Sequence, residues 1–359
     1  MTEPSNTATP IVDVHAHHFP RALAERGLTP AGPRWPHLEP GAEGSGRILV
    51  GDSVFRQVTS DLWDVAERVA VLDRTGIATQ VVSPVPVMLT YWADGPSAAA
   101  YARAVNTTLA EDVAQAPERL VGLGTVPLQA PELAVEELRH AVTTLGLRGV
   151  EIGSSAEGVD LDAAALRPFW EAAQELDALV LVHPMDGGGG VVRRAGQPYD
   201  FGAGMLTDTA LAAGSLVFGG VLEEFPRLTV CLVHGCGAFP WLYPRMRLAD
   251  QVWGNGDPAA ADARVRSLWV DTLVFDSEHL RLLVHRFGPD KVVVGTDHPF
   301  FPAVTPDVER FVTEAADIGA IARADVEAVL SGNARRLLAR GESPTSDDGA
   351  MTSIGGRSE

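Results

Sequence analysis

The chain has 359 residues, of which 46% are hydrophobic and 21% are charged, and its formal net charge is −19. A chain of this length can bury a large core, either as one big α/β domain or as two smaller ones. The acidic balance, without a cluster of basic residues, argues against nucleic acid as a partner.

The two ends of the chain and its apolar runs set further limits. No apolar run approaches the roughly 18 residues of a membrane-spanning helix, so we expect no membrane partner. The first ten residues, MTEPSNTATP, contain neither the basic nor the apolar part of an export signal, and we expect a cytoplasmic protein. Residues 1–9 and the Ser-, Gly- and Asp-rich residues 341–359 are predicted to be disordered.

Between these ends, eight short runs rich in β-branched residues predict buried parallel strands. They cover residues 11–15, 78–83, 120–126, 148–152, 178–183, 228–234, 267–272 and 291–296. Helical patterns such as 64–76 and 132–146 separate them. Eight strand-and-helix units predict one α/β domain over residues 10–340, a (β/α)₈ TIM-like barrel rather than an open doubly wound sheet.

The segment after the first strand differs from the rest. Residues 20–62 are rich in Pro and Gly and show little periodicity. We interpret this segment as a long insertion that lies over the mouth of the barrel.

The first strand, IVDVHAH, ends in a cluster of polar side chains. Because side chains alternate along a strand, Asp13, His15 and His17 share one face. His18 breaks this alternation and is interpreted as a loop or cap residue. Asp13 is expected to be a structural residue or to support one of the liganding histidines.

Three later strands also deliver polar side chains where they end. His183 ends the fifth strand, His234 ends the sixth, and Asp297 follows the eighth. Barrels carry their chemistry at the carboxyl ends of the strands, so these residues are expected to meet there. Imidazoles together with a carboxylate suit a divalent metal that keeps an open position. The alternative is a set of unrelated polar residues that are satisfied locally.

Longer motifs give the chain a family resemblance. DVHAH, VFRQV, VPVMLTYWA, HGCGAFP, GTDHPF and GNARRLL together resemble the amidohydrolase superfamily, in the branch of 2-amino-3-carboxymuconate-6-semialdehyde decarboxylase. The resemblance covers roughly residues 11–340. VPVMLTYWA and HGCGAFP are more specific than the metal motif, which much of the superfamily shares.

The resemblance implies a role for each matching position. It implies one divalent metal, usually zinc, held by His15, His17, His183 and Asp297. His234 matches a histidine that activates the metal-bound water and is not itself a ligand. Arg56 and Arg245 match two arginines that hold the substrate carboxylate, and the second comes from the neighbouring subunit, which implies a homodimer. Without the resemblance, both arginines would be read as ordinary surface residues.

The resemblance further implies a metal-dependent, non-oxidative decarboxylase of a carboxylated muconate semialdehyde or a related unsaturated or aromatic acid. In this mechanism a metal-bound hydroxide adds beside the carboxylate, and collapse of the adduct, with Asp297 at the reacting centre, releases carbon dioxide. A hydratase or hydrolase that uses the same hydroxide is the alternative. A catalytically silent barrel that only binds a metal is a third possibility.

Lysine usage and several departures from the family refine this interpretation. Some relatives use a carboxylated lysine on the fourth strand to bridge two metals. Lys291 is the only lysine here, and it opens the eighth strand at the end of the barrel away from the metal site. A single metal is therefore favoured. Family members usually have lysines in the region where this chain has Val50 and Ser53. They usually have Trp where this chain has Met185, and Tyr where it has His298. Because these positions surround the substrate in the family, the resemblance does not predict which acid is the substrate. The sequence also does not say whether the glycine run Gly187–Gly190 covers the site.

Overall fold

The computed structural model describes residues 10–185, 192–301 and 307–339. The predicted disordered ends, 1–9 and 341–359, and the glycine run Gly187–Gly190 lie outside the described residues. The domain boundaries at 10 and 340 therefore stay a prediction.

Eight parallel strands form the central sheet, and the predicted barrel is confirmed. In spatial order they are β1 (Ile11–His18), β5 (Ile77–Pro84), β6 (Leu120–Gly124), β7 (Gly149–Gly153), β10 (Leu179–His183), β11 (Thr229–Leu232), β12 (Trp269–Asp271) and β13 (Val292–Val293). Parallel bridges from Asp13 to Val294 and from Ala16 to His298 join the last strand region back to the first. All eight predicted runs are strands, in the predicted order.

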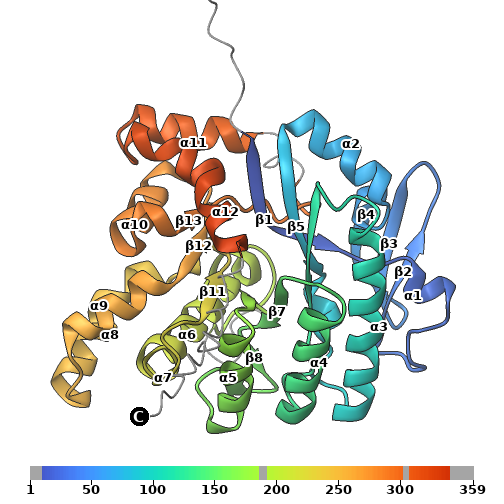
Figure 1. Cartoon of the computed structure of the whole chain (residues 1–359), viewed down its shortest axis with the longest axis horizontal. Coiled ribbons are helices and arrows are strands. Elements are labelled where there is room, and N and C mark those ends of the chain that lie inside the picture. The colour runs from blue at the N-terminus through green and yellow to red at the C-terminus, as the bar shows by residue number, and fades with distance from the viewer. Residues whose placement is uncertain (1–9, 186–191, 302–306, 340–359) are drawn as a thin grey trace, which may run out of the picture.

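Helices surround the strands (Figure 1). The longer ones are α2 (Val65–Thr75), α3 (Gly95–Val113), α4 (Pro131–Thr143), α5 (Arg167–Glu175), α6 (Met205–Phe218), α8 (Phe239–Ala249), α9 (Pro258–Ser267), α10 (Ser277–Phe287) and α11 (Val308–Asp317). Local sequence explains where they begin and end. In α2, the Asp64 side chain accepts hydrogen bonds from the backbone N–H groups of Ala66 and Glu67, and Gly76 ends the helix at a φ of 73°.

Shorter elements complete the chain. They are α1 (Ala22–Glu25), α7 (Val221–Glu224), α12 (Asn333–Leu338) and the small antiparallel pair β8 (Ser155–Ala156) and β9 (Val159–Asp160). The Arg148 side chain donates hydrogen bonds to the carbonyls of Leu337 and Leu338, so α12 is tied to the residue that precedes β7.

One apolar helix departs from the expectation that no segment has membrane-spanning character. The helical segment Asp200–Phe218 is long and apolar enough to cross a membrane by length and composition, and half of its most apolar window is buried inside the protein. It packs against α8 and α7, as a helix in the outer layer of a barrel does.

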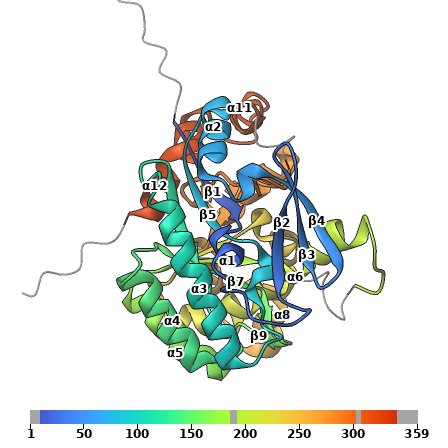
Figure 2. The same cartoon turned by 90° about the vertical axis from the view of Figure 1, so that its right-hand side faces the viewer.

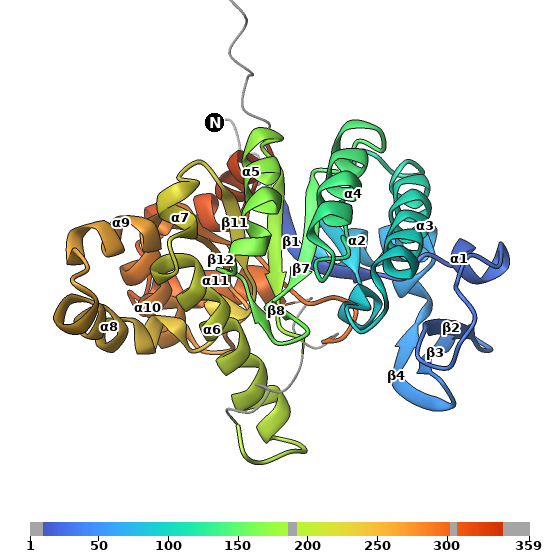
Figure 3. The ribbon, with the colours of Figure 1, turned by 90° about the horizontal axis from the view of Figure 1, so that it is seen from below.

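The inserted segment contains a three-stranded antiparallel sheet that its sequence did not predict. Its strands are β2 (Pro36–Pro40), β3 (Ser45–Val50) and β4 (Ser53–Thr59). The sheet stands beside the barrel next to α1 (Figures 2 and 3). A core of its own, which includes Trp35, Ile48 and Leu62 from the insertion with Tyr101 and Val105 of α3, fastens it to the barrel.

Candidate metal centre and active site

Four side chains converge at the carboxyl end of the barrel. One ring nitrogen each of His15, His17 and His183 and a carboxylate oxygen of Asp297 all lie within 4.8 Å of one another, and all four residues are buried. His15 and His17 belong to β1, and His183 ends β10. The backbone N–H of Asp297 donates to the carbonyl oxygen of His15 at 2.8 Å, which fixes the loop after β13 against β1.

The atoms that face this centre have the properties of metal ligands. The Nε2 atoms of His15, His17 and His183 and Oδ1 of Asp297 are buried and make no hydrogen bond within the described residues. Nε2 of His17 lies 2.9 Å from Oδ1 of Asp297, but without hydrogen-bond geometry. Buried polar atoms are rarely left without a partner, so three imidazoles and one carboxylate fit a divalent cation.

The electrostatics of the centre favour the ligand forms of His183 and Asp297. Burial acts to lower the pKa of His17, but its contacts with Asp297 and Glu151 raise it. Burial lowers the pKa of His183 well below its ordinary value, and the neighbouring imidazoles lower it further. Burial alone would raise the pKa of Asp297, but its contacts with His17 and His234 and the charge of His15 hold that pKa well below its ordinary value. Neutral imidazoles and an ionised carboxylate are the forms that bind a metal.

The carboxylate that orients His15 was not foreseen from the sequence. Oδ2 of Asp271, the last residue of β12, accepts a hydrogen bond from Nδ1 of His15 at 2.8 Å, which leaves Nε2 to face the centre. Asp13 was expected to be a structural residue or a partner of a liganding histidine. Its carboxylate accepts from Gln80, from Thr296 and from the backbone N–H of His15, so it holds the backbone of His15 and makes no hydrogen bond to the imidazole ring among the described residues.

A buried glutamate lies near Nδ1 of His17, the ring nitrogen that does not face the metal centre. Oε2 of Glu151 in β7 accepts from the hydroxyl of Ser83 at 2.5 Å and lies 3.7 Å from Nδ1 of His17. Burial raises the pKa of Glu151 to about 7.

Lys291 stacks on Trp269, 4.3 Å from the ring centroid, and is not in the ligand group. Among the described residues, that group offers ligands for one cation.

His234 borders the centre but is not in the ligand group. Its ring centroid lies 5.2 Å from those of His15 and His183, and its Nε2 lies 4.0 Å from Oδ2 of Asp297. Both of its ring nitrogens are buried and have no hydrogen-bond partner within the described residues. His234 therefore borders the centre without belonging to its ligand group, and its role in activating a metal-bound water stays a prediction.

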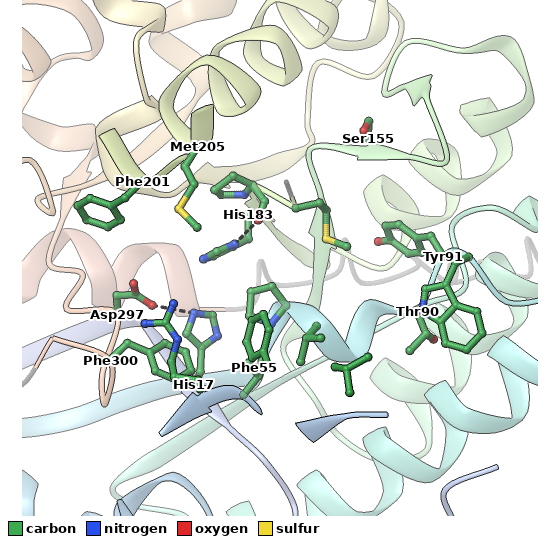
Figure 4. Close-up of a pocket in the computed structure, with 18 of the residues that line it drawn as sticks. His17, Phe55, Thr90, Tyr91, Ser155, His183, Phe201, Met205, Asp297 and Phe300 are labelled. Carbon is green, nitrogen blue, oxygen red and sulfur yellow. Dashed lines mark hydrogen bonds and ion pairs between the residues drawn. The ribbon is translucent and has the colours of Figure 1, made fainter. Parts of the chain in front are cut away.

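A cavity of about 560 Å³ opens from the metal centre (Figure 4). His17, His183, His234 and Asp297 lie in its wall, and much of the remaining wall is aromatic or apolar. Phe55, Tyr91, Phe201, Met205 and Phe300 are part of this apolar wall. A mostly apolar cavity with a few polar groups at one end suits a small organic acid.

The two predicted carboxylate-binding arginines have different positions. Arg56 of β4 lines the cavity, and its guanidinium carbon lies 4.7 Å from the ring centroid of Phe300. Arg245 lies on α8, is exposed and does not line this cavity. In Figure 1, α8 and the strands β2–β4 lie at opposite ends of the molecule. Of these two arginines, only Arg56 lines the cavity of the chain to which it belongs.

Three other positions singled out in the sequence are also resolved. Nε2 of His18 lies 2.9 Å from Oδ2 of Asp112 on α3, so His18 is a buried structural residue and not a loop residue. His298 is buried too, and its Nε2 lies 2.9 Å from Oδ2 of Asp61 in the insertion. Met185 lines the cavity.

Comparison with known proteins agrees with this geometry. The amidohydrolase family model matches residues 12–340. The chain belongs to the amidohydrolase family. A 2-amino-3-carboxymuconate-6-semialdehyde decarboxylase from Dictyostelium discoideum is 33% identical over 296 residues, which are 80% of this chain and 81% of the relative.

Solved structures share the fold. The 5-carboxyvanillate decarboxylase from Sphingomonas paucimobilis has a TM-score of 0.75 at 24% identity, over 92% of this chain and 99% of the other. The dihydroxybenzoic acid decarboxylase from Polaromonas sp. JS666, with bound manganese and the inhibitor 2-nitroresorcinol, has a TM-score of 0.69 at 23% identity, over 92% and 97%. These relatives are carboxy-lyases, the enzyme class predicted for this chain.

Proposed function

We propose that the protein is a metal-dependent, non-oxidative decarboxylase of a carboxylated muconate semialdehyde or of a related unsaturated or aromatic acid. One observation carries this proposal. Three residues with unpartnered ligand atoms, His17, His183 and Asp297, line the same largely apolar cavity as Arg56. This shared cavity supports a role for Arg56 as the cation that binds the substrate carboxylate near the metal centre.

The residues of the chain have distinct tasks in this reaction. A divalent cation held by His15, His17, His183 and Asp297 would act as a Lewis acid and lower the pKa of a bound water. Arg56 binds the acid group of the substrate and orients it toward the centre. Decarboxylation replaces a carboxylate by a proton, and His234 is placed to take a proton from water and to supply one to the carbon.

Zinc is our first choice for the cation, because three imidazoles and one carboxylate form a ligand set that zinc accepts. The manganese in the Polaromonas structure makes manganese the second choice. Metal analysis of the purified protein, followed by chelation and separate reconstitution with each ion, tests this order. Higher turnover with manganese at equal occupancy would overturn it.

The exposed face of α8 supports the proposed homodimer. Trp241 is 80% exposed, and Trp253, just beyond the helix, is 81% exposed. Trp241 also lines a second, apolar cavity of about 640 Å³ that reaches His234. Because large exposed apolar side chains are typical of interfaces, we propose that α8 packs against a second copy and that Arg245 reaches the partner's active site.

Subunit mixing tests this arrangement. Arg245→Gln and His234→Asn chains, each nearly inactive alone, should regain up to about a quarter of wild-type activity per site when mixed and allowed to exchange, because some dimers then contain one intact site. Activity that does not recover, in a mixture shown to contain heterodimers, would place Arg245 outside the active site.

The reaction itself is tested with the metal-reconstituted protein. Muconate semialdehydes and hydroxybenzoates are supplied in turn, and carbon dioxide and product mass are followed together. Carbon dioxide release with a product lighter by one carboxyl group is expected. Product that gains water without carbon dioxide release would instead identify a hydratase or hydrolase.

A further inference from the structure

A second arginine lines the cavity, and the proposed reaction gives it no role. Arg34, from the loop before β2, lines the cavity together with Arg56. Among the described residues, no carboxylate lies within ion-pair distance of either guanidinium, although the chain carries a net charge of −19. Two guanidiniums that line one cavity without a carboxylate partner are available to bind an anionic ligand that enters it.

Aromatic rings hold the two guanidiniums in different places. The guanidinium carbon of Arg56 lies 4.7 Å from the ring centroid of Phe300, and that ring lies 5.4 Å from the ring of His17. The guanidinium carbon of Arg34 lies 4.2 Å from the ring centroid of Trp92. Stacking on a ring leaves the N–H edge of a guanidinium free for a carboxylate.

The two rings mark opposite ends of the cavity. Figure 4 shows Phe300 and Asp297 on one side, and Thr90 and Tyr91, which directly precede Trp92, on the other. Arg56 therefore belongs to the metal end. Arg34 is exposed and stacks on Trp92, the residue after Tyr91.

We propose that Arg34 is a second anion-binding residue and that it selects substrates with a second acidic group remote from the carboxylate that is lost. This inference rests on the proposed function for the reaction, but the binding preference can be measured without turnover. Arg34 would hold the distal acid while Arg56 presents the reacting carboxylate to the centre. Glu157, the carboxylate in the described cavity wall other than Asp297, is the residue that would oppose a diacid.

The test measures binding of unreactive probes to the metal-loaded protein by calorimetry. Isophthalate and terephthalate carry two carboxylates, and benzoate carries one. We expect at least one diacid to bind about tenfold more tightly than benzoate, and Arg34→Gln to remove that difference while benzoate binding is unchanged. Arg34→Lys should restore part of it, because the charge is kept.

Arg47→Gln is the matched control. Arg47 lies in the same inserted sheet, is exposed and pairs with Glu39, outside the cavity. It should leave every affinity unchanged. Equal weakening of benzoate and the diacids in Arg34→Gln, at unchanged thermal stability, would overturn the proposal. So would tighter binding of 4-(aminomethyl)benzoate than of terephthalate, since Glu157 would then select the ligand.

The outcome is separable from that of the proposed function. If no substrate releases carbon dioxide but the diacid preference is present and depends on Arg34, the reaction assignment fails and the binding inference holds. If carbon dioxide is released equally well from monoacids and diacids, in wild type and in Arg34→Gln, the reaction holds and the inference about Arg34 fails.

Discussion

The barrel mouth and the inserted segment both line one cavity, and their residues have different surroundings. His15 and His17 are 0% exposed, and Asp297 is 6% exposed. Arg56 is half-buried and Arg34 is exposed, on a sheet and a loop that pack beside the barrel. The histidine ligands are held at strand ends of the barrel, whereas the two cations sit on the inserted sheet and the loop before it. In our proposal, the barrel mouth carries the groups that perform the reaction, and the inserted segment carries the groups that select the substrate.

The largest expected effect comes from the mouth. Asp297→Asn keeps the shape of the side chain but removes the charged ligand. We expect metal content to fall and kcat/KM to drop by more than about 10³-fold, because the reaction depends on the cation. Elemental analysis of the purified variant and a carbon dioxide assay measure both. A variant with full metal content and full turnover would show that this cluster is not the reaction centre.

His234→Asn separates proton transfer from metal binding at the same mouth. Metal content should stay at the wild-type level, because His234 is not in the ligand group. Turnover should fall by about 10²- to 10³-fold, the usual contribution of a positioned acid or base. Full turnover with metal bound would mean that another group moves the proton.

Asp271→Asn tests the hydrogen bond that orients the ligand His15. Loss of the carboxylate that fixes Nδ1 of His15 should weaken metal binding by about 10- to 100-fold, measured by competition with a chelator. Asp13→Asn is the comparison, because Asp13 does not contact the imidazole. It should affect stability more than metal affinity. Equal losses of affinity in both variants would contradict the special role of Asp271.

Arg56→Gln moves the test to the inserted segment. We expect KM for the acid substrate to rise by about tenfold, because a charged hydrogen bond to the carboxylate is lost, while metal content is unchanged. Arg47→Gln should leave both values at the wild-type level. If Arg56→Gln lost metal instead, the insertion would be part of the metal centre and the contrast between the two regions would fail.

The same contrast explains what the sequence predicts well. Near-continuous apolar runs mark strands that are covered on both faces, so all eight barrel strands could be found. The residues at their ends then identify His15, His17, His183 and Asp297, because parallel strands end at one edge of the sheet. These inferences need only local patterns and the general geometry of barrels.

Residues that depend on distant neighbours could not be found in this way. Asp271 and His15 are 256 positions apart, and their contact requires knowing that both side chains point to the barrel interior. The inserted sheet has short strands interrupted by Pro and Gly, and its stability comes from packing on α3. Arg34 precedes this sheet in an irregular loop, so nothing local marks it as a cavity residue.

The smallest expected effect concerns the link between the two regions. Asp61 of the insertion contacts His298, next to the ligand Asp297, and it also accepts a hydrogen bond from Thr59. Burial acts to raise the pKa of Asp61, but the contact with His298 and the hydrogen bond from Thr59 lower it from 3.8 to about 2. The folded state therefore favours the ionised form, and Asp61 stabilises the fold above about pH 4.

This stabilisation should disappear as the pH falls from about 4 toward 2, where the folded-state carboxyl becomes protonated. Asp61→Asn should lower the free energy of unfolding by about 1 to 2 kcal/mol at pH 7, a value reduced for its partial contact with solvent. Denaturant unfolding of wild type and variant at pH 7 and near pH 3 measures the difference, which should be smaller at the lower pH. A difference that grows on acidification would mean that Asp61 is protonated in the folded protein. The insertion would then be held by packing alone, and the two regions would be more independent than the contact between Asp61 and His298 indicates.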